Sequence, residues 1–479
     1  MERKFLTNLF LFLGLNFLIK PFWIFGIDRT VQNTVGEHVY GIYFALFNFS
    51  MIFNMLLDFG IINFNNRSIA RSKDFLQESF SRIFTLKLLL GVFYIAFVLI
   101  AGSIVGYNIC QYNMLIALVI NQFLSSFILY LRSNISGLLM FKTDSILSVI
   151  DRIIMIICCG ILLWGNVTNT PFQIEWFVYT QTFAYIFTIA IALFVILGKT
   201  KLKSPYIDYD YFKYIFRKSF PFALLTLLTG LHNRIDAVFL ERLLPNGVGA
   251  EQVGIYASAF RLLDAAMIVA YLFSVLLVPL FSRMTAEKES VGSLVKTSFT
   301  LIFIYGVIVA VLSYFYSYPL MEKLYHNHVI QSSYVFQILM LSIVPISATY
   351  IFGSLLTANG NLKQLNIIAF LAMFLNIGLN IVLIPHYLAM GSAIASICTQ
   401  LFIIVTEIVI SKKVFSLKLS LKYIIRLSCF LFFTILSAWF SLKLPFAMIA
   451  NLVIAFSICI SLVFILGLIK PKEIILLLK

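Results

Sequence analysis

Long apolar runs, separated by short polar connections, follow one another along almost the whole chain. An α-helix needs about 20 mostly apolar residues to cross the hydrocarbon core of a bilayer. The runs are continuous, whereas strands of a membrane β-barrel alternate between apolar and polar residues. The pattern predicts about fourteen transmembrane helices, at 5–27, 39–62, 83–105, 112–133, 145–165, 175–198, 218–240, 253–280, 294–316, 334–357, 364–384, 389–410, 422–442 and 446–469.

The composition supports an all-α integral membrane protein. The 479 residues are 61% hydrophobic and 11% charged, and their mean hydropathy is +0.99. Soluble domains carry about 25% charged residues, so lipid rather than water is expected to cover most of this surface. The N-terminal run continues past Lys20 and Pro21 without a small-residue cleavage site, which predicts an uncleaved first span.

Basic residues are distributed unequally between the two sides of the predicted membrane. The even-numbered connections and both termini hold most lysines and arginines, whereas the odd-numbered connections hold only Arg29, Arg242, Lys323 and Lys443. By the positive-inside rule, both termini lie in the cytoplasm. Contact with anionic membrane lipids then accounts for the formal net charge of +15, and no nucleic-acid partner is needed.

Two stretches of the chain repeat each other. DRTVQNTVGEHVYGIY at 28–43 and ERLLPNGVGAEQVGIY at 241–256 align without a gap, and each is expected to be an outside loop that runs into a span. This indicates a duplicated six-helix unit, as in transporters with a substrate site between their repeats. We expect two pseudo-symmetric six-helix bundles, 1–200 and 201–411, followed by two additional helices in 412–479.

Some cations lie inside the predicted spans, where an ionised group costs about 2.5–3.5 kcal/mol at the bilayer centre. Lys20, Arg234 and Arg261 lie well inside spans 1, 7 and 8. They predict a cationic cavity that attracts an anionic, phosphate-bearing substrate. Internal pairing is the alternative, because Arg261 and Asp264 share one helix face. Four other cations, near the predicted cytoplasmic ends, are expected to reach the headgroups: Lys87, Arg152, Lys296 and Arg426.

Asp236 in span 7, with Asn376 and Asn380 on one face of span 11, forms a set of hard oxygen ligands. Such a set suits Na⁺, and a carboxylate alone can carry a proton, so coupling to Na⁺ or H⁺ is a hypothesis. The alternative is a hydrogen bond between helices. Further candidate polar residues of the cavity are Asn48, Asn54, Asp58 and Asp264.

Signatures of enzymes and metal sites are missing from the sequence. No CxxC, Walker A, HExxH or GxSxG sequence occurs, and the connections are too short for an ATPase domain. His326 and His328 share one loop, but two imidazoles make a weak metal site. We therefore expect no metal, no cofactor and no enzymatic activity.

Three segments resemble those of a known family: LLDFGIINFNNRSIAR at 56–71, GLLMFKTDSILSVIDR at 137–152 and VGIYASAFRLLDA at 253–265. They are similar to segments of Wzx-type polysaccharide flippases, of the multidrug/oligosaccharidyl-lipid/polysaccharide (MOP) exporter superfamily that also contains the MATE transporters. The resemblance implies two bundles around a central cavity. Alternating access there would move an undecaprenyl-diphosphate-linked oligosaccharide to the outer leaflet of a bacterial plasma (inner) membrane.

The resemblance also implies substrates and partners. The substrate would be a repeat unit of O-antigen lipopolysaccharide, capsule or exopolysaccharide, and other polysaccharide-assembly proteins are candidate partners. Related flippases line the cavity with arginines from their first, second and eighth helices. Arg261 fits the eighth helix and Lys20 replaces an arginine in the first, but span 2 carries no arginine in its body.

Two other functions remain open on the sequence. A cation-coupled multidrug or small-molecule antiporter belongs to the same superfamily, although its cavity would favour acids over the embedded Lys20, Arg234 and Arg261. A membrane enzyme of polysaccharide assembly, such as a polymerase or ligase, would carry a large outside loop. The longest outside loops here are only 241–252 and 317–333.

Overall fold

The computed structural model describes residues 14–16, 18–72, 74–165, 167–200, 209–245, 247–417 and 420–469. These residues are helical throughout their regular parts and contain no strand. Ten helices within them are long and apolar enough to cross a membrane. The prediction of an all-α, multi-pass membrane fold is therefore confirmed.

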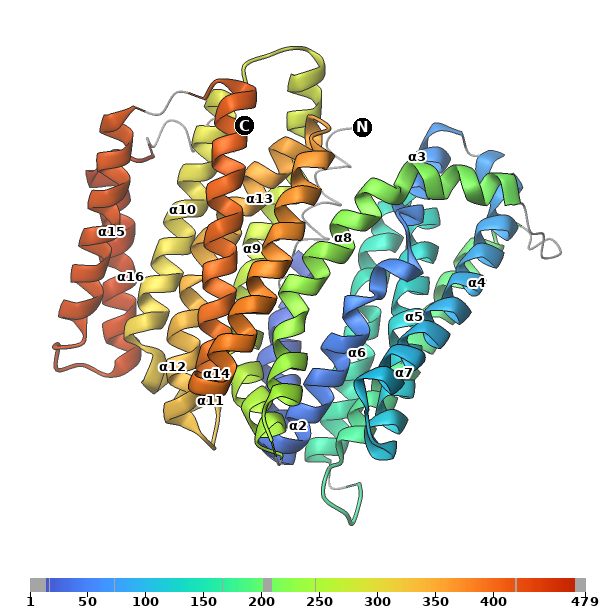
Figure 1. The fold of residues 1–479 in the computed structure, drawn as a ribbon, viewed down its shortest axis with the longest axis horizontal. Coiled ribbons are helices and arrows are strands. Elements are labelled where there is room, and N and C mark those ends of the chain that lie inside the picture. The colour runs from blue at the N-terminus through green and yellow to red at the C-terminus, as the bar shows by residue number, and fades with distance from the viewer. Residues whose placement is uncertain are drawn as a thin grey trace. The chain divides into compact units, whose positions relative to one another are not determined.

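The chain divides into two compact units, Met1–Gly254 and Ile255–Lys479. Figure 1 shows their helices in chain order. The first unit holds η1 (Trp23–Asp28), α2 (Arg29–Ile52), η2 (Asn54–Leu57), α3 (Ile61–Arg71), α4 (Asp74–Val105), α5 (Ile109–Gly137), α6 (Phe141–Trp164), α7 (Ile174–Leu197) and α8 (Tyr209–Leu243). The boundary falls within α9 (Val248–Ala286). The second unit continues with α10 (Gly292–Phe315), α11 (Ser317–Leu324), α12 (Val329–Leu341), α13 (Ile343–Ala358), α14 (Leu362–Phe415), α15 (Leu421–Ser441) and α16 (Met448–Ile465).

The compact units and the sequence repeat divide the chain at different places. The repeat divides it between residues 200 and 201, whereas α8 packs along α2 and so belongs to the first compact unit. The domains 1–200, 201–411 and 412–479 thus remain a prediction. In the second unit, α15 and α16 pack on α10 through a core that includes Ile308, Phe430 and Cys459 (Figure 1).

Two predicted spans, 364–384 and 389–410, form the single element α14. Its 54 residues would extend about 80 Å as a straight helix, far beyond the thickness of a bilayer. The backbone leaves the helical region at Leu388, three residues after Pro385. The Ser392 hydroxyl then donates to Asn380 Oδ1 at 2.8 Å, although twelve residues separate them. The chain therefore folds back at Leu388, which preserves two separate spans.

The first repeated stretch holds a tight turn that runs into the second span. The element Arg29–Ile52 leaves the helical region at Gly36, which takes φ 80° and ψ 164°. The Tyr40 hydroxyl donates to Asp28 Oδ2 at 2.9 Å although twelve residues separate them, so the chain folds back at Gly36 as it does at Leu388. The described part of the first span is also helical and continues into η1, while residues 1–13 and 17 lie outside the described residues. Gly378 lies in continuous helix, and the break in α14 falls at Leu388.

The matching glycines of the repeat lie where α2 meets the start of α9. A Cβ at Gly41 would overlap the carbonyl oxygen of Ala250, and a Cβ at Gly254 would overlap that of Glu37. Gln32 Nε2 also donates to the Gly254 carbonyl oxygen at 2.9 Å, in a buried position. Gly41 and Gly254 occupy the same column of the repeat. The two matching stretches therefore place one small residue on each side of a single backbone crossing.

We expect Gly41→Ala to lower the free energy of unfolding by about 1–3 kcal/mol, because the added methyl group forces two backbones apart. Gly254→Ala should have a similar effect. The measurement is thermal unfolding of the purified protein in detergent.

Gly378→Ala is the matched control, since a Cβ there meets no atom within 4 Å. That variant should be as stable as the wild type or slightly more so, because alanine favours a helix over glycine. Equal stability of Gly41→Ala and Gly378→Ala would contradict the close crossing.

Candidate functional site

Arg234 and Asn48, two of the predicted site residues, lie together in the first unit. Arg234 is half-buried on α8, and its Nη1 donates to Asn48 Oδ1 of α2 at 3.3 Å. Asn48 is 1% exposed, and its own amide donates to the Phe44 carbonyl oxygen. The amide thus turns its oxygen toward the guanidinium, and the packing of α8 along α2 positions both groups.

Lys20 lies in a second group of charges, which we call the Lys20 cluster: Lys20, Arg132, Asp144, Asp151 and Arg152. The ammonium of Lys20 is within electrostatic range of Arg152, Arg132 and Asp151. Arg132 Nε donates to Asp144 Oδ1 at 2.8 Å, and Arg152 Nε lies 3.7 Å from Asp151 Oδ2. These five groups carry three positive and two negative charges, which leaves an excess of one positive charge.

The Arg152 guanidinium lies 5.4 Å from the centre of the Trp23 ring, a cation–π distance. Trp23 stacks in turn on Phe177 of α7, with ring centres 5.5 Å apart. Arg152 therefore packs among aromatic side chains of the first unit. The sequence had predicted that this arginine would extend to the lipid headgroups. One feature of the sequence could have indicated that Arg132 and Arg152 belong to this cluster. Charged residues are dense between them, and Asp144 and Asp151 lie seven residues apart, on one helix face.

Asp58 forms a closed pair with Lys87. The Lys87 ammonium, 2% exposed, donates to Asp58 Oδ1 at 3.0 Å, to the Leu57 carbonyl oxygen at 2.6 Å and to the Ser126 hydroxyl at 3.2 Å. The Asp58 carboxylate also accepts from the backbone of Gly60 and Ile62 at the start of α3. The expectation that Lys87 reaches the headgroups was wrong, because the backbone break after η2 brings a carboxylate to it.

Asp236 lies buried on α8 in the first unit, at 2% exposure. Asn376 and Asn380 are fully buried on α14 in the second unit. Asn380 Nδ2 donates to Asn376 Oδ1 at 3.1 Å, which places both amides on one face as the sequence predicted. Because Ser392 donates to Asn380 Oδ1, this amide also links the two halves of α14.

The remaining predicted residues lie on both sides of the unit boundary. Asn54 is half-buried at the start of η2, and Arg261 and Asp264 are half-buried on α9 in the second unit. Arg426, expected at the headgroups, donates to the Gly467 carbonyl oxygen at 3.3 Å, just after α16. Over the described part of the chain, no three His, Cys, Asp or Glu side chains gather as metal ligands would.

Comparisons with known proteins agree with this architecture. A family model described as "Polysaccharide biosynthesis protein" matches residues 25–285, more than half of the chain. No protein with a curated description matches the sequence.

Several solved structures share the fold. The structure described as lipid II flippase MurJ in an inward closed conformation has a TM-score of 0.71 at 15% identity. That match covers 97% of this chain and 99% of MurJ. An inward-facing multidrug resistance MATE family transporter of the MOP superfamily has a TM-score of 0.64 at 13% identity, with coverage of 85% and 94%. A MOP superfamily transporter from Pyrococcus furiosus has a TM-score of 0.56 at 14% identity, with coverage of 84% and 92%.

The buried pair of Lys87 and Asp58 yields a prediction about stability. Asp58→Asn leaves the Lys87 ammonium buried without a counter-charge, and breaking a buried pair costs about 3–5 kcal/mol. The double variant Lys87→Met/Asp58→Asn should recover a large part of that loss. Thermal unfolding in detergent measures both.

Glu287→Gln is the comparison, because it breaks the exposed pair of Arg283 and Glu287, which solvent screens and which contributes little to stability. If Asp58→Asn were as mild as Glu287→Gln, the pair would not stabilise the fold. A double variant no better than Asp58→Asn would show that the two residues act independently.

Proposed function

The chain belongs to the polysaccharide biosynthesis protein family, and from this premise we propose that it flips a lipid-linked oligosaccharide across the membrane. The substrate would be an undecaprenyl-diphosphate-linked repeat unit of a surface polysaccharide. Transport would proceed by alternating access, from the inner to the outer leaflet of a bacterial plasma membrane, with both termini in the cytoplasm.

The observation that carries this proposal is the gathering of cations within the membrane-spanning part of the first unit. The Lys20 cluster has one more cation than carboxylates, and Arg234 hydrogen-bonds a neutral amide. Cations are costly within a bilayer, and an anionic ligand among them would lower that cost. A diphosphate suits guanidinium groups, which donate two parallel hydrogen bonds to phosphate oxygens.

The polarity of the site favours a flippase over a multidrug antiporter. MurJ, with the same fold, is described as a lipid II flippase. The description of the Pyrococcus furiosus transporter says that the reverse polarity of its binding pocket suggests a different function. Pocket polarity thus distinguishes functions on this fold, and cations in the spans here match an anionic rather than a cationic substrate.

Coupling to Na⁺ or H⁺ would involve Asp236 on α8 of the first unit. Asn376 and Asn380, on α14 of the second unit, stay candidate oxygen ligands on the sequence alone. The buried carboxyl of Asp236 supports this role, because acids within membrane spans commonly mark ion pathways and proton relays. The hydrogen bond from Asn380 to Asn376 Oδ1 supports the competing structural role equally. The two roles predict different effects of ion gradients on transport.

The first test is translocation of a fluorescent undecaprenyl-diphosphate oligosaccharide in proteoliposomes. Arg234→Ala and Arg261→Ala should each reduce transport at limiting substrate about tenfold or more, because a hydrogen bond to a charged group contributes about 1.5–3 kcal/mol. Lys20→Ala should have an effect in the same direction.

Arg283→Ala is the matched control, because this arginine lies at the exposed end of α9 and pairs with Glu287. It should transport like the wild type. Normal insertion and thermal stability of each variant must accompany the assay. A wild-type protein that moves no lipid-linked glycan but exchanges organic cations for Na⁺ or H⁺ would refute the flippase and favour the antiporter.

The second test measures the same transport under imposed Na⁺ or pH gradients. Asp236→Asn should abolish the response to the gradient while leaving the binding of substrate intact, because the carboxylate carries the coupling charge. Asp210→Asn, on the exposed start of the same helix, should respond like the wild type. Wild-type transport that ignores both gradients would remove the coupling role from Asp236.

A further inference from the structure

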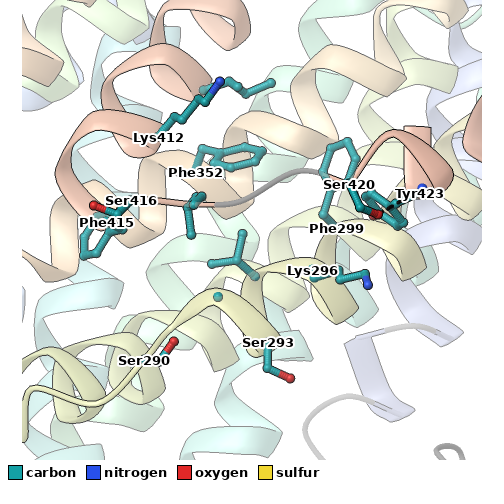
Figure 2. A pocket seen from close by; sticks show the side chains of 14 residues that line it. Ser290, Ser293, Lys296, Phe299, Phe352, Lys412, Phe415, Ser416, Ser420 and Tyr423 are labelled. Atoms are coloured by element: carbon teal, nitrogen blue, oxygen red, sulfur yellow. Dashed lines mark hydrogen bonds between the residues drawn. The ribbon is translucent and has the colours of Figure 1, made fainter. Parts of the chain in front are cut away.

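A cavity of about 640 Å³ lies at one end of the second unit, away from every residue assigned above to substrate or ion. Its walls come from the start of α10, the end of α14 and the start of α15, with Phe352 of α13 (Figure 2). Because α10 and α14 cross the membrane, their ends lie at the depth of the lipid headgroups. The cavity therefore opens where lipid phosphates are found.

The lining of this cavity is amphipathic. Lys296 and Lys412 are its charged groups, and the described residues around it include no acid. Four serines add hydroxyl donors: Ser290, Ser293, Ser416 and Ser420. Apolar walls complete it: Val295, Phe299, Phe352, Ile408, Phe415 and Leu417. Figure 2 shows the labelled lysines, hydroxyls and phenyl rings around one opening.

Lys296 is held at this site by the first of the two additional helices. Its ammonium lies 5.1 Å from the centre of the Tyr423 ring on α15, and the Tyr423 hydroxyl is 2.8 Å from that of Thr300 on α10. Tyr423 is 9% exposed, so it forms a fixed wall. The lysine itself is exposed, and its three N–H donors can reach a ligand. The site therefore exists only where α15 docks on the second unit.

We propose that this cavity binds an anionic glycerophospholipid, with its negatively charged headgroup attracted by Lys296 and Lys412 and its acyl chains along the phenyl rings. Two cations without an acid select a negative headgroup over a zwitterionic one. The serine hydroxyls suit the glycerol and phosphate oxygens, and the apolar wall suits hydrocarbon next to them. A lipid bound there contacts α10, α14 and α15 together, so it stabilises the docking of the additional helices.

The test is native mass spectrometry of the purified full-length chain, titrated with dioleoyl phosphatidylglycerol or with dioleoyl phosphatidylcholine. The wild type should bind the phosphatidylglycerol in preference. Lys296→Gln and Lys412→Gln should each weaken that binding about fivefold, the factor expected for one basic residue at an anionic lipid surface. Both side chains are exposed, so neither substitution leaves a buried group unpaired.

The matched control is Lys363→Gln/Lys413→Gln, which removes two exposed lysines of α14 that do not line the cavity. It should bind phosphatidylglycerol like the wild type. The proposal would be overturned if the wild type bound phosphatidylglycerol and phosphatidylcholine equally well. It would also be overturned if the control variant lost as much phosphatidylglycerol binding as Lys296→Gln or Lys412→Gln. Displacement of the lipid by millimolar inorganic phosphate would also overturn it and assign the cavity to a soluble anion. None of these readouts depends on flippase activity.

Discussion

The first unit depends on a backbone crossing that leaves no space for a side chain. Gly41 on α2 faces Ala250, and Gly254 faces Glu37, so each glycine meets the segment that precedes the other. In a membrane, helices associate through close packing and hydrogen bonds rather than through expulsion of water. Small residues at a crossing, with the Gln32 amide bonded to the Gly254 carbonyl, provide both. The position of α8 along α2, and hence of Arg234 against Asn48, follows from this packing.

The embedded cations differ in how completely their partners neutralise them. Lys87 has a carboxylate, a backbone carbonyl and a hydroxyl around a 2% exposed ammonium, so all three of its N–H donors are used within the fold. Among the contacts of Arg152 are a carboxylate at 3.7 Å, an aromatic face and the Met155 sulfur at 3.4 Å, and its side chain is 30% exposed. An ammonium whose three N–H donors are all used within the fold, like that of Lys87, can only stabilise the folded protein. A guanidinium with donors near an accessible surface can exchange partners, as binding of a ligand requires.

The apolar pattern predicted the spans well because span length and hydropathy are local properties. It located α4–α7, α10, α12, α13, α15 and α16, and even the two halves of α14. It missed α11, which lies in the expected outside loop 317–333. It could not show that Asp58 and Lys87 are paired, since 29 residues separate them and the backbone break at Phe59 and Gly60 brings them together. The proximity of Lys20 and Arg132 could not be predicted either, because these residues are also far apart in the sequence. The repeat was visible in the sequence, but the contact between its two glycines is a tertiary property.

The two acids that accompany three cations in the Lys20 cluster are compatible with the proposed role of this cluster in binding an anionic ligand. Fully unpaired guanidinium groups would raise the cost of insertion for every copy of the protein, whether or not substrate is present. Pairing Arg132 with Asp144 at 2.8 Å lowers that cost and holds the guanidinium in one orientation. A phosphate group then has to compete with a carboxylate, which weakens its binding. The proposed flippase activity would need such moderate binding, because a lipid diphosphate held too tightly would not leave in the outer leaflet.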